Sequence, residues 1–215
     1  MAHGKASDTL PSVAVIIPAL NVAETIGAQL DALAKQRYDG HWEVLVANNG
    51  CTDATQAVVR SFSDRLPAVT WVDATSHRGI NHARNRGAEA TDAEILLFCD
   101  GDDVVTEGWI AEMSAALRQA AAAGGSIEYR HLNPESERPT SLPRSITDPD
   151  WLPSPYGANS GVRRQMWEEL GGFDETLVGS EGPPTKRTSS GAFSWPEGSS
   201  ALQSRRSTVV CVSRG

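Results

Sequence analysis

Cysteine is scarce in this sequence, and long apolar runs are absent. Among 215 residues there are three cysteines, Cys51, Cys99 and Cys211, an odd and widely spaced set that suits neither a disulfide framework nor a zinc site. No stretch is long enough to span a bilayer, and the N-terminal MAHGKASDTLPS has no apolar signal-peptide core. We therefore expect a cytoplasmic protein without a transmembrane segment, free or peripheral at the inner face of the membrane.

Basic residues are also few. Lysine and arginine number 19 against 27 aspartates and glutamates, which gives a formal net charge of −8. A nucleic-acid binder needs basic surface to neutralise phosphates, so we expect no nucleic-acid partner. An anionic ligand would instead need a metal ion, a helix N-terminus or a few arginines placed beside it.

The first half of the chain alternates between strand-like and helix-like segments. Apolar runs predict strands at Val13–Ile17, Trp42–Val46, Val69–Val72 and Glu94–Cys99. Apolar residues at helical spacing predict helices at Ala23–Gln36, Asp53–Phe62, Gly79–Ala90 and Glu107–Ala123. Further on we expect a strand near Ser126–Arg130, a long loop, and a short helix at Arg163–Leu170 that stops at Gly171–Gly172. This order predicts an α/β fold with a mostly parallel central sheet.

Polar residues follow three of the predicted strands. They are PALN (Pro18–Asn21), ANNG (Ala47–Gly50) and DGDD (Asp100–Asp103). Ligands of such sheets bind at the carboxyl ends of the strands, so these three segments define a candidate pocket.

The acidic segment has two interpretations. Asp100 and Asp102 can chelate a hard divalent cation that bridges a diphosphate, while Gly101 lets the backbone approach a ligand closely. Alternatively, the segment is an acidic turn, in which Asp103 caps the next helix. The short motif does not decide between them.

The other two segments are equally open. Asn48 and Asn49 offer amides that can read a base edge, but an Asn-Gly turn before a helix capped by Thr52 or Asp53 explains them as well. Arg84 can meet a phosphate or hold an aspartate in place, or belong to a solvated basic face. We expect the two nearby histidines, His77 and His82, to make ordinary hydrogen bonds.

Taken in order, the motifs are more specific than each is alone. VIIPALN, NNGCTDAT, ARNRGAEATDAEILLFCDGDD and RRQMWEELGGFDETL together resemble glycosyltransferase family 2, inverting enzymes of the GT-A fold. The resemblance extends from about Ser12 to Glu181. It implies a Rossmann-like GT-A sandwich that moves a sugar from a nucleotide-sugar donor to a glycan, lipid-linked or small-molecule acceptor.

The resemblance also implies roles for individual residues. Asp100 and Asp102 match the metal-binding DxD motif, which carries Mg or Mn on the sugar-nucleotide diphosphate. Asn48 matches a position that is usually an aspartate in contact with the base, so the base identity stays open. The implied nucleotide-sugar-binding residues are Pro18, Ala19, Asn21, Glu24, Asn48, Gly50, Arg84, Asp100 and Gly101.

After GGFDETL the chain departs from the family pattern. Members usually reach a Glu-Asp pair whose aspartate is the general base, but here Gly182 follows Glu181, so Glu181 is the candidate catalytic residue. Periodicity is then lost, whereas regrouping the codons from Lys186 in another frame permits a helix-like string. We infer a truncated or frame-shifted C-terminal part.

This departure sets the expected organisation. We predict a flexible N-terminus over residues 1–12, a nucleotide-binding half over 13–103, an acceptor-side half over 104–181 and a disordered tail over 182–215.

Two competing functions remain. One is an inactive nucleotide-sugar-binding remnant without its base; the other is a nucleotidyltransferase, which usually carries a glycine-rich basic phosphate loop that PALNVAETI lacks.

Overall fold

The computed structural model describes residues 9–135, 137, 158–176 and 210–212. Its main sheet has the strand order β3-β2-β1-β4-β8-β6. The first four strands in this order are mutually parallel, whereas β8 runs antiparallel to both β4 and β6. The predicted α/β fold with a mostly parallel sheet is confirmed.

The elements follow one another in short segments. The strands are β1 (Val13–Ala19), β2 (Trp42–Asn48), β3 (Val69–Asp73), β4 (Ile95–Cys99), β5 (Val104–Val105), β6 (Ala122–Gly124), β7 (Ser126–Glu128), β8 (Asn159–Arg163) and β9 (Val210–Val212). The helices are α1 (Ile26–Leu33), α2 (Thr55–Arg60), α3 (Ile80–Glu89), α4 (Trp109–Leu117) and α5 (Arg164–Leu170).

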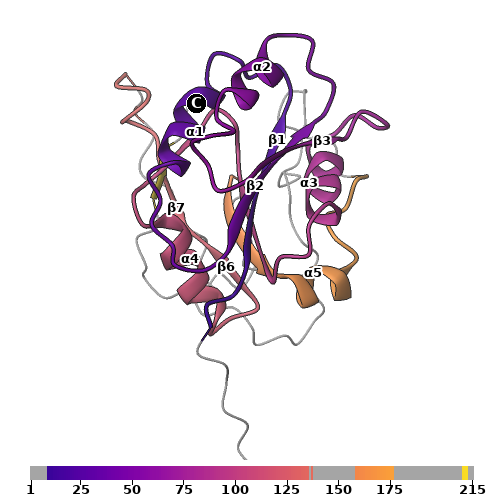
Figure 1. The fold of residues 1–215 in the computed structure, drawn as a ribbon, viewed down its shortest axis with the longest axis vertical. Helices are drawn as coiled ribbons and strands as arrows, with labels where there is room; N and C mark the ends of the chain where they lie inside the picture. The colour runs from indigo at the N-terminus through magenta and orange to yellow at the C-terminus, as the bar shows by residue number, and fades with distance from the viewer. Residues whose placement is uncertain (1–8, 136, 138–157, 177–209, 213–215) are drawn as a thin grey trace, which may run out of the picture.

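Alternate residues of the central strands supply two cores, one on each face of the sheet. Val13, Val15 and Ile17 of β1 join the cluster that α1 and α4 cover, whereas Ala14 and Ile16 join the one beneath α3 and α5. Figure 1 shows this three-layer arrangement, with α1 and α4 on one side of the sheet and α3 and α5 on the other. Burial on both faces explains why these strands are continuous apolar runs in the sequence.

Helix α3 lies unusually close to the sheet. A Cβ atom added at Gly87 would lie 2.5 Å from Cγ2 of Ile16 on β1. Only glycine fits there without movement of a neighbour, so Gly87 fixes the depth at which α3 packs. This contact matters for the site because α3 also carries Arg84.

The fourth predicted helix is wrong in its second half. Glu107–Ala123 was expected to be one helix, but α4 ends at Leu117 and Ala122–Gly124 form β6. The alanine-rich segment favours a helix by intrinsic propensity, and the ladder with β8 overrides it. Strand β8 itself, built from the polar and glycine-containing NSGVR, was not foreseen.

A second, three-stranded sheet has the order β5-β9-β7. Its middle strand comes from the tail that was predicted to be disordered: Val210–Val212 pair antiparallel with β5 and parallel with β7. The remaining residues of 182–215, and residues 1–8 of the expected flexible N-terminus 1–12, lie outside the described residues. For them the prediction stays a prediction.

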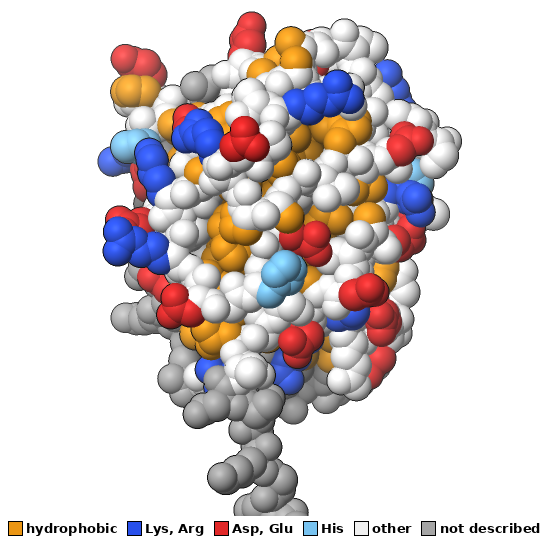
Figure 2. All heavy atoms as spheres, in the orientation of Figure 1, with side chains coloured by type: hydrophobic (Ala, Val, Ile, Leu, Met, Phe, Trp, Pro, Cys, Tyr) orange, Lys and Arg blue, Asp and Glu red, His pale blue; other side chains and the backbone are white. Residues whose placement is uncertain are grey.

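Two observations concern the expectations that the chain has no nucleic-acid partner and no membrane-spanning segment. On the face that Figure 2 draws, acidic and basic side chains are interspersed, without a continuous basic area. Within the described ranges, no helix has the length and hydropathy that a bilayer span requires.

Candidate active site

The three polar segments meet at one edge of the main sheet. Strand pairing places Ala19 opposite Asn48 and Asn48 opposite Asp73, while Ile16 pairs with Phe98 close to the end of β4. The pairing continues into the loops, because the backbone N–H of Asn49 donates to the carbonyl oxygen of Ala19 at 2.8 Å. The convergence expected from the sequence is therefore present.

The acidic turn after β4 is held by a buried glutamine of α1. Nε2 of Gln29 donates to the carbonyl oxygen of Asp100 at 3.4 Å, and its Oε1 accepts from the backbone N–H of Val105 at 2.9 Å. A Cβ atom on Gly101 would lie 3.2 Å from Cγ2 of Val22, so glycine lets the turn lie against the loop that precedes α1. Asp102, between these anchor points, is exposed.

Arg84 pairs with the first carboxylate of this turn. Its Nη2 donates to Oδ1 of Asp100 at 3.0 Å, and its side chain is only 3% exposed against 26% for Asp100. The guanidinium carbon also lies 5.5 Å from the centre of the Phe173 ring. The structure therefore shows Arg84 holding an aspartate in place, one of the roles that the sequence left open.

The carboxylates fit a divalent cation that is shared with a ligand. Asp102 is exposed, and Oδ2 of Asp100 makes no hydrogen bond to a described residue. Within the described ranges, no group of three or more His, Cys, Asp or Glu side chains could hold a metal by itself. This donor set suits Mg or Mn, which bind through one or two carboxylates and take their other ligands from phosphate oxygens and water.

Asp103 does not have the role that the sequence predicted. It was expected to cap a helix, but β5 begins at Val104 and α4 only at Trp109, after Gly108. Asp103 is 1% exposed. The carboxylate is part of the buried turn rather than a solvated cap, because the chain forms a strand before the helix starts.

Asn48 and Asn49 have different tasks. Oδ1 of Asn48 accepts from the backbone N–H groups of Gly50 and Cys51, at 3.1 and 2.8 Å. Asn49 is buried; its Nδ2 donates to the carbonyl oxygens of Ala74 and His77, and its Oδ1 accepts from the N–H of Gly79. Asn49 thus joins the loop after β2 to the loop after β3.

The loop after β1 is attached to the loop after β2. Asn21 has a left-handed backbone, with φ of 54°, and its Oδ1 accepts from the N–H of Thr52 at 2.8 Å. Sγ of Cys51 donates to the carbonyl oxygen of Ala19 at 3.3 Å. Pro18 is half-buried in β1, whereas Glu24 is exposed at the edge. These predicted nucleotide-side residues are neighbours in space.

Asp53 lies two residues before α2 and anchors the first loop. Its Oδ1 accepts from Thr55, and its Oδ2 accepts from the N–H of Ala23 at 3.0 Å. The hydrogen bond from the Thr55 hydroxyl is the main reason that the pKa of Asp53 lies below its ordinary value. The N-cap of α2 is Ala54, without a side-chain cap hydrogen bond, so the predicted cap at Thr52 or Asp53 is wrong, although Asp53 does accept from the N–H of the first helical residue.

Cys51 and Cys99 differ in their surroundings. Cys99 is fully buried at the end of β4; burial, then the charges of Asp100 and Asp103, raise the pKa of its thiol well above the ordinary value. It is a packing residue and not a nucleophile. Both Cys51 and Cys99 are free thiols.

On the other side of the acidic turn, α3 holds the GGFDETL segment. Asn85 makes a reciprocal pair with the backbone of Phe173 and donates to Oε1 of Glu175 at 2.8 Å. Nδ1 of His82 lies 2.9 Å from Oε2 of Glu175, and its Nε2 lies 3.0 Å from the hydroxyl of Ser76. The expectation that His82 makes ordinary hydrogen bonds is met.

Glu175 is a site-edge residue that the sequence did not single out. Partial burial acts to raise the pKa of its carboxyl, but the hydrogen bonds from Asn85 and His82 outweigh it and hold the pKa below the ordinary value. In the sequence, only the i, i+3 spacing of His82 and Asn85 could have indicated such partners. Glu181, the predicted catalytic residue, lies outside the described residues.

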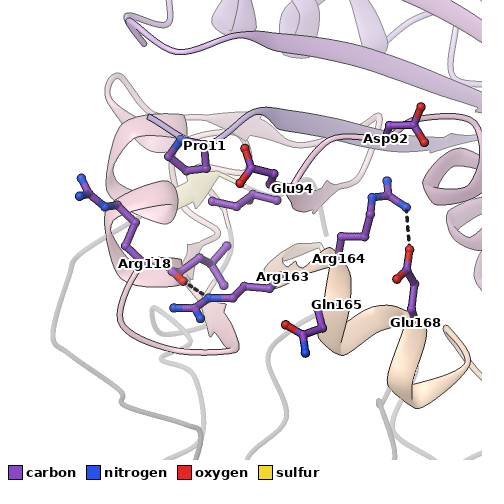
Figure 3. A pocket seen from close by; sticks show the side chains of 10 residues that line it. Pro11, Asp92, Glu94, Arg118, Arg163, Arg164, Gln165 and Glu168 are labelled. Carbon is purple, nitrogen blue, oxygen red and sulfur yellow. Dashed lines mark hydrogen bonds and ion pairs between the residues drawn. The ribbon is translucent and has the colours of Figure 1, made fainter. Parts of the chain in front are cut away.

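Two cavities lie away from this edge. One of about 470 Å³ lies near the amino ends of β1 and β4, among the charged side chains that Figure 3 shows. Two of its arginines have structural partners: Arg163 donates to the carbonyl oxygen of Leu117 at the end of α4, and Arg164 to those of Ala93 and Thr91. Another, of about 670 Å³, lies between α1 and β5. Neither contains a predicted site residue.

Comparison with known proteins gives one family. The family model described as Glycosyl transferase family 2 matches residues 14–171, more than half of the chain. Glycosyltransferase AglE of Haloferax volcanii is 31% identical over 199 residues, covering 87% of this chain. The O-antigen biosynthesis protein RfbC of Myxococcus xanthus is 29% identical over 193 residues, covering 77%. The chain spans 64% of AglE and 15% of RfbC.

Solved structures share the fold. TarS of S. aureus, in complex with UDP, has a TM-score of 0.62 at 20% identity, over 79% of this chain and 52% of that one. The mannosyltransferase PcManGT of Pyrobaculum calidifontis, in complex with GDP-Man and Mn2+, has a TM-score of 0.56 at 25% identity, over 81% and 52%. The fold is therefore that of GT-A glycosyltransferases.

Proposed function

The chain belongs to glycosyl transferase family 2, and on that premise we propose that it transfers a sugar from a nucleotide-sugar donor to an acceptor hydroxyl, with inversion at the anomeric carbon. The observation that carries the proposal is the acidic turn after β4. There an exposed carboxylate, Asp102, stands two residues from Asp100, whose orientation Arg84 fixes. The turn lies at the carboxyl edge of a parallel sheet, where ligands of such sheets bind.

The acidic turn needs a cation if its ligand is a diphosphate. With a formal charge of −8 on the chain and three carboxylates in the turn, an anionic ligand would be repelled. A bound Mg or Mn would neutralise charge on the departing nucleoside diphosphate. Asp100 and Asp102 would hold the ion, and Arg84 keeps Asp100 oriented toward it. PcManGT, whose structure contains Mn2+ and GDP-Man, supports this assignment.

The nucleoside would lie beside the loops after β1 and β2. We assign to it Pro18, Ala19, Asn21, Glu24, Asn48 and Gly50, with Arg84, Asp100 and Gly101 toward the diphosphate. The interlocking of Asn21 with Thr52, and of Cys51 with Ala19, gives these loops one fixed arrangement. Prior fixation of a binding loop lowers the entropy that is lost on binding.

The acceptor would approach from the side of α3 and GGFDETL. A general base must take the proton of its hydroxyl, and Glu181 is our candidate because it follows the segment that Asn85 and His82 hold. The sequence Glu181–Gly182 also supports a second candidate function, a nucleotide-sugar-binding protein without a catalytic base. The acceptor would be a glycan, a lipid-linked sugar or a small molecule, and the free thiols of Cys51 and Cys99 support a cytoplasmic site of action.

The test separates donor chemistry from acceptor transfer. The full chain is incubated with a panel of nucleotide sugars and Mn²⁺, and both nucleoside diphosphate release and transfer to glycan, lipid-linked and small acceptors are measured. We expect metal-dependent binding of a nucleotide sugar and transfer that Glu181→Gln lowers by about 10²–10⁴-fold. Binding without transfer, unaffected by Glu181→Gln, would favour the second function. No binding of any nucleotide sugar would refute both.

A further inference from the structure

The side chain of Asn48 has a fixed hydrogen-bond polarity. Its Oδ1 faces the backbone N–H groups of Gly50 and Cys51 at 3.1 and 2.8 Å. In the reversed orientation the amide NH₂ would face two N–H groups, so these contacts settle which atom is oxygen and which is nitrogen. The two lone pairs of Oδ1 are both occupied.

The other end of the amide remains for a ligand. Nδ2 of Asn48 makes no hydrogen bond to any residue in the described ranges, and the side chain is half-buried at the end of β2. An amide NH₂ has two N–H groups and no lone pair to offer. Toward a ligand at this edge, Asn48 can therefore only donate.

The surrounding loop keeps the amide from turning over. The two N–H groups whose hydrogen bonds it accepts belong to a turn that is attached on both sides. Cys51 donates a hydrogen bond from its Sγ to Ala19, and the side chain of Asn49 makes hydrogen bonds to the backbone of Ala74, His77 and Gly79. Reversal would break both bonds of Oδ1 and leave two N–H groups without acceptors. The polarity is thus built into the loop.

From this polarity, and resting on the proposed function, we propose that Asn48 selects the donor by its base and favours a cytidine or adenosine diphosphate sugar over a uridine or guanosine one. The ring nitrogen in the middle of the pairing edge is an acceptor in cytosine (N3) and adenine (N1), whereas uracil N3–H and guanine N1–H are donors. A donor that meets a donor leaves both groups unpaired, which discriminates strongly in a partly buried site. Uracil can offer O4 only by shifting along its edge.

The substitution Asn48→Asp is an informative test of this selection. It keeps the size of the side chain and keeps an oxygen that accepts from Gly50 and Cys51. The second carboxylate oxygen accepts at the place where Nδ2 of the native amide donates. The same substitution should therefore weaken the binding of cytosine and strengthen that of uracil at one site, which loss of folding cannot do.

The experiment is calorimetric titration of CDP, ADP, UDP and GDP, with Mn²⁺, into the full native chain and Asn48→Asp. We expect the native chain to bind CDP or ADP about tenfold more tightly than UDP or GDP, and Asn48→Asp to reverse the order of CDP and UDP. Gln165→Glu, which adds a negative charge on α5 near the opposite edge, should keep the native order.

Each other outcome counts against the inference. Equal affinities, tighter binding of UDP or GDP by the native chain, or a CDP-to-UDP ratio that Asn48→Asp leaves unchanged would overturn the base selection and leave the proposed function standing. If none of the four diphosphates binds to the folded native chain, the proposed function fails and this inference fails with it.

Discussion

Replacement of Asp100 and of Asp102, two carboxylates of the acidic turn, should lower the free energy of unfolding by different amounts. Arg84 is 3% exposed, and its hydrogen-bonded counter-charge is Asp100, so Asp100→Asn leaves a buried cation without its ion-pair partner. Breaking a fully buried pair costs about 3–5 kcal/mol. Because the Asp100 side chain is 26% exposed and asparagine keeps an oxygen for Arg84, we expect a loss of about 2 kcal/mol.

The matched control is Asp102→Asn, two residues away in the same turn. Asp102 is exposed, so this change should alter the free energy of unfolding by less than about 0.5 kcal/mol. Urea denaturation followed by circular dichroism measures both: with an m-value of about 2 kcal/mol/M, the midpoint of Asp100→Asn should fall by about 1 M. If both variants shift equally, or Asp100→Asn does not shift, the role assigned to Arg84 is wrong.

Three further changes test the packing around the site. Gly87→Ala should lower the free energy of unfolding by about 1–3 kcal/mol, measured by urea denaturation, because its Cβ would meet Ile16. In an Ile16→Ala background the same change should be harmless or stabilising. An equal cost in both backgrounds would contradict the contact. Asp103→Ala, at a side chain 1% exposed, should cost more than the roughly 1 kcal/mol of a lost surface cap, and a loss below that value would favour the cap. The hydrogen bonds from Asn85 and His82 hold the pKa of Glu175 below its ordinary value, so its stabilising contribution is complete above about pH 4.3 and is lost as the pH falls through the lowered pKa. Glu175→Gln should flatten that part of the stability–pH curve, and an unchanged slope would contradict these two hydrogen bonds.

The sequence was sufficient to predict the first four strands and the edge at which their loops meet. Runs such as VAVII and ILLFC are buried on both faces of the sheet, and that is the condition under which hydrophobicity alone identifies a strand. Asn21 and Asp102, which follow these runs, are exposed where the strands leave the core. The predicted site residues of this edge, from Pro18 to Asp102, are consequently neighbours.

Long-range pairing was beyond what local patterns could predict. The ladder between β6 and β8 joins an alanine-rich segment to NSGVR, neither of which reads as a strand by itself. Gln29 looks like an ordinary helix residue, yet it holds the acidic turn through two backbone groups 71 and 76 positions away. Asn85 and His82 could be matched to Glu175 only after the fold had brought α3 beside GGFDETL.

The proposed chemistry requires the acidic turn to act through a cation, and calorimetry of nucleoside diphosphate binding measures this requirement. CDP, ADP, UDP and GDP are titrated into the full chain with Mn²⁺, with EDTA, and with Mn²⁺ into Asp102→Asn, after urea denaturation has shown that the variant is folded. We predict that the tightest of the four binds with Mn²⁺ and that its affinity falls at least about tenfold in both other conditions. Equal affinity with Mn²⁺ and EDTA would contradict a cation-dependent site.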